Sequence, residues 1–174
     1  GQGSTQELAF GGSSLDGFDW RLSMAPVTTD GDFSDFERYD RTLILIEGYG
    51  LTLNHNSGQT DVLNQRFDLA PFDGGWRTNA KLHDGDILDF NVMTRQHKCR
   101  SKVTTSDGTE DQYLSFCTSL LLIYAVDSEI TVITPDSYAI KLAGKHLFQT
   151  EVAKPGQWLM TGGPFVCVEI DYNH

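Results

Sequence analysis

The chain has 174 residues, a length that suits one domain or two small lobes and can bury a sizeable core. It carries 13 Lys and Arg residues against 24 Asp and Glu residues, a formal net charge of −11. Such an acidic surface repels phosphate backbones and anionic lipid headgroups, so we expect neither nucleic acid nor a membrane as a partner. The longest apolar runs, residues 43–46 and 120–126, are far too short to span a bilayer.

The strands expected from the sequence are short, apolar or alternating runs bounded by Gly, Asp, Asn and Ser. The 17 glycines and repeated Asp-Gly steps mark turns between them. This pattern predicts an all-β protein of the sandwich or barrel class. In chain order the expected strands are residues 19–24, 41–46, 50–54, 65–69, 78–82, 86–94, 112–123, 128–134, 138–142, 144–150, 157–160 and 165–172.

An internal echo divides the chain into two similar halves. Residues 42–46 followed by 51–53 resemble residues 121–125 followed by 130–132, at an offset of 79 positions. We therefore expect an N-terminal segment (1–17, beginning with a tag-like Gly/Ser stretch), a first half (18–96), a polar linker (97–111) and a second half (112–174). A chance match of Leu, Ile and Thr patterns is the alternative explanation of the echo.

The cysteine pattern points to the compartment. Cys99, Cys117 and Cys167 are an odd and widely spaced set, which is not a disulfide framework. The sequence also has no Asn-x-Ser/Thr glycosylation acceptor. Both features favour a reducing environment, and we expect a cytoplasmic protein.

Metal and nucleophile motifs are missing from the sequence. The five histidines form no His-x-His or His-x3-His pair, and His97 with Cys99, the only close nitrogen and sulfur pair, lies in the expected linker. No Gly-x-Ser-x-Gly elbow or phosphate-binding glycine loop occurs. We expect neither a metal nor another cofactor, although metal ligands can also converge from distant strands.

The arginines mark the first half as the place to search for a site. All seven arginines lie within residues 1–100, whereas lysine is the only cation beyond. Arginine is favoured where a planar carboxylate is recognised. Strand alternation places Arg21 with Ser23, Arg41 with Glu47, and Asn91 with Met93 and Arg95 on shared faces. These faces are expected to form the concave side of a barrel, with ordinary surface pairing between Arg and Asp as the alternative.

Several runs of the first half resemble the HutD/Ves family of cupin-like proteins. The resemblance covers about residues 18–95, and the second half shares only the general pattern. The runs are WRLSMA (20–25), DGDFS (30–34), YDRT (39–42) with EGYG (47–50), PFDGGW (71–76) and DFNVMTR (89–95).

The resemblance implies a double cupin, two small antiparallel β-barrels in one compact chain, in agreement with the echo. It also implies a link to bacterial histidine utilisation, in which the family is thought to bind a small metabolite and moderate expression. Metal-binding cupins carry a His-x-His motif, which is missing here around Gly48 and His55.

We therefore predict non-catalytic binding of a small anionic or polar metabolite, with a regulatory role. The expected ligand is a carboxylate-bearing intermediate of histidine degradation, urocanate or N-formylglutamate. Glu47 would accept an amine or imidazole N–H of that ligand, or else be solvated. The alternatives are a cupin-type metal-dependent oxygenase or isomerase and a structural module, and a homodimer is compatible with the fold. The predicted ligand-binding residues are Arg21, Ser23, Arg41, Glu47, Asn91, Met93 and Arg95.

Overall fold

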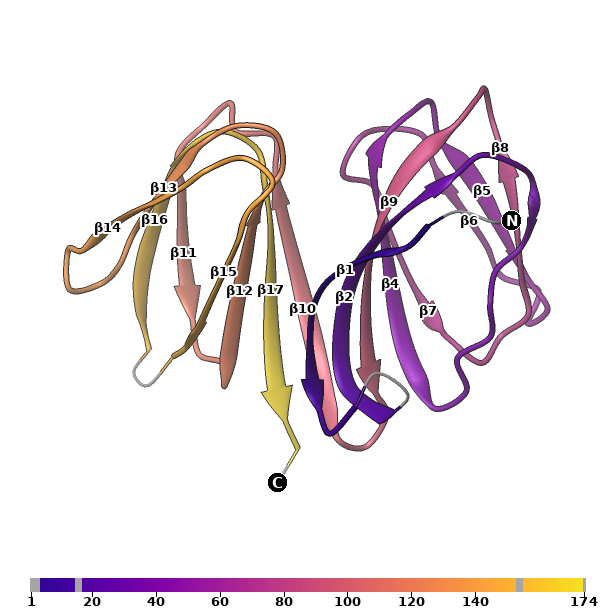
Figure 1. The fold of residues 1–174 in the computed structure, drawn as a ribbon, viewed down its shortest axis with the longest axis horizontal. Coiled ribbons are helices and arrows are strands. Elements are labelled where there is room, and N and C mark those ends of the chain that lie inside the picture. Colours follow the sequence, from indigo (N-terminus) through magenta and orange to yellow (C-terminus); the bar gives the residue numbers. More distant parts are fainter. Residues whose placement is uncertain (1–3, 15–16, 153–154, 174) are drawn as a thin grey trace. The chain divides into compact units, whose positions relative to one another are not determined.

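A computed structural model describes residues 4–14, 17–152 and 155–173, and among these it contains no α-helix. The all-β prediction is therefore confirmed (Figure 1). None of the described residues belongs to a helix long and apolar enough to cross a membrane. The strands are β1 (Gln6–Gly12), β2 (Phe18–Val27), β3 (Gly31–Asp32), β4 (Tyr39–Glu47), β5 (Leu51–His55), β6 (Thr60–Leu63), β7 (Leu69–Asp73), β8 (Thr78–Leu82), β9 (Ile87–Arg95), β10 (Cys99–Ser106), β11 (Gln112–Phe116), β12 (Leu120–Ala125), β13 (Ile130–Ile133), β14 (Ala139–Leu142), β15 (Leu147–Glu151), β16 (Gly156–Gly162) and β17 (Phe165–Tyr172).

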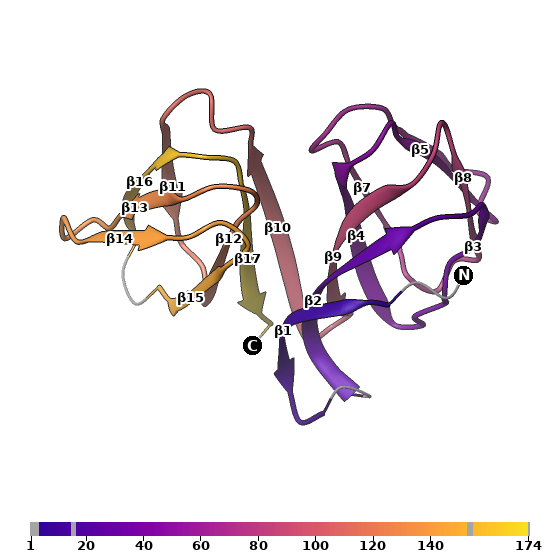
Figure 2. The same ribbon diagram turned by 45° about the horizontal axis from the view of Figure 1, so that its top comes forward.

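The chain divides into two compact units, the first ending at Arg100 and the second beginning at Ser101. The first unit has one sheet in the order β1-β2-β9-β4-β7 and another in the order β3-β8-β5-β6. The strand β1 lies at the edge of its sheet, beside β2 (Figure 2). In the second unit the sheets run β10-β17-β12-β15 and β11-β16-β13-β14.

The two units share one topology. The strand β2 corresponds to β10, β3 to β11, and so on through β9 and β17, because both sheets of the first unit then reproduce the strand orders of the second. Among the strands of the described residues, β1 alone has no counterpart. The internal echo therefore reports a true repeat of one antiparallel unit.

A β-bulge explains why the echo is out of register in one strand pair. Leu43 and Leu45 point into the first core, whereas Leu121 and Ile123 point into the second. Since faces alternate along a strand, an odd offset of 79 would match each inward-facing residue of β4 with an outward-facing residue of β12. The register shift between Leu45 and Glu47 adds one residue, so that the offset is 80 in β4 and 79 in β5.

Three expected elements differ from the observed ones. The segment expected as a linker, residues 97–111, contains β10, the counterpart of β2, which is polar because much of it is only half-buried. The segment 65–69 is mainly a turn, in which the Asp68 carboxylate accepts from the N–H groups of Asn64 and Gln65, and β7 begins at its end. The run 112–123 is two strands, separated where the Thr118 hydroxyl donates to the Ile170 carbonyl.

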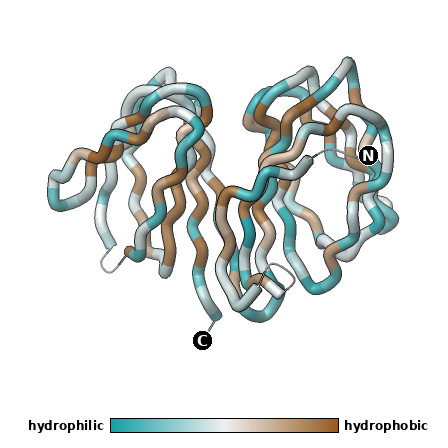
Figure 3. Tube along the Cα trace, viewed as in Figure 1, coloured by the Kyte–Doolittle hydropathy of each residue, from teal (hydrophilic) through white to brown (hydrophobic). Residues whose placement is uncertain are grey.

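Each unit has its own apolar core. The hydrophobic residues of both units, brown in Figure 3, lie mostly on the strands. The first core includes Leu43, Leu45, Leu51, Leu53 and Phe72. On the opposite face of the larger sheet, Trp20 and other apolar residues are buried too. The inner face is apolar toward β5 and becomes polar toward Arg41, where the site lies.

Candidate functional site

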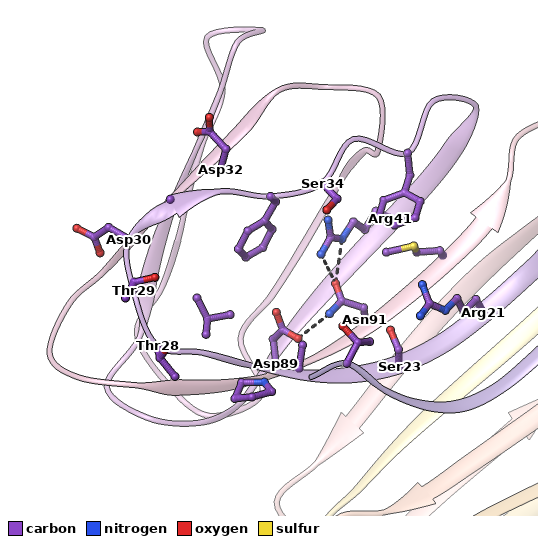
Figure 4. Close-up of a pocket in the computed structure, with 18 residues that line it drawn as sticks. Arg21, Ser23, Thr28, Thr29, Asp30, Asp32, Ser34, Arg41, Asp89 and Asn91 are labelled. Atoms are coloured by element: carbon purple, nitrogen blue, oxygen red, sulfur yellow. Dashed lines mark hydrogen bonds between the residues drawn. The ribbon is translucent and has the colours of Figure 1, made fainter. Parts of the chain in front are cut away.

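A small cavity lies in the first unit, beside the inner face of β2, β4 and β9 and the segment 28–36 (Figure 4). Its volume is about 190 Å³. An apolar cavity of about 150 Å³ can hold benzene, so this one suits a small metabolite. The lining residues are Thr5, Arg21, Ser23, Ala25, Pro26, Val27, Thr28, Thr29, Asp30, Gly31, Asp32, Phe33, Ser34, Phe36, Arg41, Asp89, Asn91 and Met93.

Three buried polar side chains that line this cavity are linked by hydrogen bonds into one chain, the Arg41–Asn91–Asp89 chain. Arg41 donates through Nε and Nη2 to Asn91 Oδ1, at 2.9 and 2.6 Å. Asn91 Nδ2 in turn donates to Asp89 Oδ1 at 2.6 Å. This amide orientation is the only consistent one, because a flipped Asn91 would set its NH₂ group against the guanidinium donors. Asn91 thus separates the cation from the anion (Figure 4).

Burial shifts the pKa of both charged ends of this chain. Desolvation lowers the pKa of Arg41 to about 10, against the attraction of Asp89. Desolvation also raises the pKa of Asp89 to about 6, although Arg41, the Ala25 backbone and Asn91 favour its charged form. At neutral pH the cavity therefore contains a buried guanidinium and a buried carboxylate.

Aromatic rings hold the Arg41 guanidinium in place. Its carbon lies 4.9 Å from the ring centre of Phe33, 5.4 Å from that of Phe72 and 6.0 Å from that of Phe36. Cation–π contacts of this kind are attractive and exclude water from the guanidinium faces. The guanidinium edge is then the part that remains available for hydrogen bonds.

Three of the five Arg41 donors are left for a ligand. A guanidinium has five N–H groups, and Asn91 accepts from one on Nε and one on Nη2. For the other three, on Nη1 and Nη2, no acceptor is present among the residues that the structure describes. These donors form the end of the guanidinium to which a carboxylate binds through two parallel hydrogen bonds.

Three further residues line the cavity beside the hydrogen-bonded Arg41–Asn91–Asp89 chain. They are Arg21 and Ser23 on β2 and Met93 on β9. The Arg21 side chain is partly exposed and its Nε lies 3.1 Å from Glu7 Oε2 of β1. Its positive charge adds to desolvation in lowering the pKa of Arg41. Two cations and a hydroxyl thus face the same space (Figure 4).

The structure brings five of the seven predicted residues to this cavity: Arg21, Ser23, Arg41, Asn91 and Met93. Glu47 and Arg95 lie outside it. Glu47 is exposed after the bulge that ends the regular alternation of β4. Arg95 bonds instead to the Tyr39 hydroxyl, at 2.8 Å from Nη2, and to the Phe18 carbonyl, at 3.2 Å from Nε.

Asp89 is the buried charged residue among the cavity residues that the sequence-based prediction omitted. It shares the alternating face of Asn91 and Met93, and this alternation was the signal that could have found it. The sequence alone does not show whether an acidic residue on such a strand is buried in a cavity or exposed at the surface. Its side chain is buried, with the residue only 1% exposed.

The second unit fills the equivalent positions with apolar side chains. Arg41 lies opposite Met93, and Leu43 opposite Asn91, across β4 and β9. In β12 and β17 the corresponding pairs join Leu121 to Glu169 and Ile123 to Cys167. The counterparts of Arg41, Asn91 and Asp89 are therefore Leu121, Cys167 and Phe165, all in the second core. The polar chain is thus a feature of the first unit.

The described residues include no cluster of three His, Cys, Asp or Glu side chains that could hold a metal ion. Cys99 is buried, not exposed as a linker residue would be, and its thiol donates to the Asp19 carbonyl at 2.9 Å. The donor set of the described residues therefore does not fit a cupin metal.

A sequence model of the HutD family matches residues 1–165. The chain belongs to the HutD family. Among its relatives, a Pseudomonas putida protein described as an uncharacterized 21.2 kDa protein in the hutC 3′ region is 35% identical over 133 residues, 76% of this chain and 68% of that protein. Protein Ves of Escherichia fergusonii is 31% identical over 148 residues, 84% of this chain and 77% of Ves.

Solved structures agree with this assignment. HutD from Pseudomonas fluorescens SBW25, in a formate condition, is similar with a TM-score of 0.84 and 26% identity, over 99% of this chain and 90% of that one. A cupin 2 conserved barrel domain protein from Leptotrichia buccalis is similar with a TM-score of 0.53 and 8% identity, over 99% and 89%. That second likeness shows the fold alone. The predicted family and the cupin-type all-β fold are both confirmed.

Proposed function

We propose that this HutD-family protein binds a small carboxylate-bearing metabolite in the cavity of its first unit, without chemical turnover. The observation that carries the proposal is the buried Arg41 guanidinium, whose remaining donors border a cavity of metabolite size. A ligand carboxylate would bind end-on to Arg41, with Arg21 and Ser23 beside it. Such charge-assisted bonds contribute about 1.5–3 kcal/mol each when shielded from water.

The relatives suggest the source of the ligand. The Pseudomonas putida relative lies by its description in the hutC 3′ region, and a Pseudomonas fluorescens relative is HutD. We extend this association to the present chain. Its ligand is then an intermediate of histidine degradation, urocanate or N-formylglutamate, and binding serves regulation of that route. Both compounds carry a carboxylate and are small enough for the cavity.

Calorimetric titration with urocanate and with N-formylglutamate tests the proposal. Arg41→Ala is expected to weaken binding of the true ligand by about tenfold to a hundredfold, because the charge-assisted bonds are lost. Arg41→Lys keeps the charge but not the two parallel bonds and should weaken binding as well, which guards against misfolding of the alanine variant. Arg77→Ala, at an exposed arginine of the same unit, is the matched control and should bind as the wild type does.

Two outcomes would overturn the proposal at different points. If the wild type binds neither compound, the ligand class is wrong. If the ligand binds equally well to the folded Arg41→Ala variant, the site assignment is wrong.

A further inference from the structure

Asp89 is a buried carboxylate that carboxylate binding by Arg41 does not use. It lies on the cavity, and the residue is only 1% exposed. Its partners are Asn91 Nδ2, at 2.6 Å, and the backbone N–H of Ala25. An ionised carboxylate has about four acceptor positions, so two donors leave room for more. A buried carboxylate with spare acceptor capacity is costly unless a further donor reaches it.

Asn91 keeps this acceptor from being cancelled by Arg41. Because the amide stands between them, Arg41 and Asp89 form no direct ion pair, and each charge keeps an edge toward the cavity. The cavity therefore presents a donor edge at one end of the chain and an acceptor edge at the other. A ligand with a carboxylate alone would satisfy only the first.

The other acidic residues of the lining are occupied elsewhere. Asp30 Oδ1 accepts from the Leu82 N–H at 2.8 Å, and Asp32 Oδ1 accepts from Asn79 Nδ2 at 2.8 Å. Both residues are exposed and their carboxylates point away from the Arg41–Asn91–Asp89 chain in Figure 4. Glu47, the acceptor expected from the sequence, lies outside the cavity. This leaves Asp89 as the carboxylate that can meet a donor on a bound ligand.

We propose that Asp89 determines specificity by accepting a hydrogen bond from an N–H group of the ligand, so that the cavity selects small carboxylates that also carry an N–H donor. The inference rests on the proposed carboxylate site at Arg41 and adds a second point of recognition to it. The ligand class is then a short acid with an amide, pyrrole-type or imidazole N–H. Carboxylates without such a donor bind more weakly, because they leave Asp89 desolvated and short of a partner.

Two matched probes test this without a titrating ring. Pyrrolylacrylate and furylacrylate, with the ring joined at the same position, differ in a ring N–H against a ring oxygen. Calorimetry at neutral pH should show the wild type binding the pyrrole compound at least about tenfold more tightly, as expected for a hydrogen bond to a charged acceptor.

The Asp89→Asn variant should lose this preference. Asn91 Nδ2 requires the oxygen of the new amide, so the NH₂ group of that amide would face the ligand and oppose a ligand N–H. The furan compound should still bind, which shows that the variant is folded and that the Arg41 site is intact. Asp86→Asn makes the same chemical change at an exposed residue just before β9 and should keep the wild-type preference.

The outcomes separate the two proposals. If neither probe binds to the wild type, the carboxylate site itself is overturned. If both bind the wild type equally, or if Asp89→Asn keeps the preference, the role of Asp89 is overturned while the carboxylate site stands.

Discussion

At the scale of single residues, Asn91 determines how charge is presented in the cavity. Its amide satisfies Arg41 and Asp89 at once, and neither charge is left without a buried partner. A direct ion pair in its place would neutralise the guanidinium that the proposed ligand needs. One amide therefore lets a buried cation and a buried anion remain separate binding groups.

The burial of Asp89 also predicts a pH-dependent stability. Its pKa is raised from 3.8 to about 6, so the folded protein favours the protonated form. The contribution of protonated Asp89 to the stability of the folded state is fully present below pH 3.8 and is lost as the pH rises to about 6. Relative to Asp89→Asn, the free energy of unfolding of the wild type should fall by about 3 kcal/mol across this interval.

Denaturant unfolding of both proteins across this pH interval measures the effect. The charged residues that line the cavity with Asp89 are Arg41 from β4, Arg21 from β2, and Asp30 and Asp32 from the segment before β4. They are common to both proteins, so the difference isolates position 89. A difference in unfolding free energy that does not change with pH would show that Asp89 is not the titrating group.

The sequence predicted the site where strand alternation is regular. Arg21 with Ser23, and Asn91 with Met93, follow undisturbed alternation on β2 and β9 and reach the cavity together. Glu47 was misplaced because a bulge, which leaves no clear mark in a single sequence, precedes it. Strand alternation predicts on which face of the sheet a side chain lies, but not which group it bonds. It could therefore not show that Arg95 donates to the Tyr39 hydroxyl.

At the scale of elements, β1 lies outside the repeated topology, and it reaches the site. Thr5, just before it, lines the cavity, and Glu7 pairs with Arg21 at 3.1 Å. A register shift between Glu7 and Ala9 interrupts its pairing with β2 at this point. The strand thus adds to the first unit a carboxylate that competes with a ligand for Arg21.

This role of β1 predicts a gain of affinity on removing the competing charge. Glu7→Gln should tighten binding of furylacrylate by about two- to fivefold, the range expected for a partly exposed ion pair. Calorimetry measures it, with Glu37→Gln, an exposed residue of the same unit, as the charge-matched control. Weaker or unchanged binding by Glu7→Gln alone would mean that Glu7 positions Arg21 instead of competing for it.

The expected linker illustrates what composition misses at this scale. Polar content and a single large aliphatic residue, Val103, favoured a loop for residues 97–111. The strand β10 forms there because it pairs with β17, a partner that local sequence does not reveal. Strand boundaries that depend on such long-range pairing were therefore not predicted, whereas the apolar strands β4, β9 and β17 were placed correctly.

At the scale of the whole molecule, one antiparallel unit occurs twice, and only the first copy carries the polar chain. The echo in the sequence located the repeat but not the functional copy. The confinement of arginine to residues 1–100 indicated that the first copy is the functional one. The second copy has apolar residues, Leu121, Cys167 and Phe165, at the positions of the polar chain. Net charge could not have shown this, because both halves are acidic.

The central claim is that the Arg41 guanidinium binds the ligand carboxylate, and side-chain NMR tests it most directly. In a titration with urocanate or N-formylglutamate, the Nε–H resonance of Arg41, assigned by its loss in Arg41→Lys, should shift and saturate. The resonance of exposed Arg77 should stay in place. Saturable binding that leaves the Arg41 resonance unmoved would contradict the account.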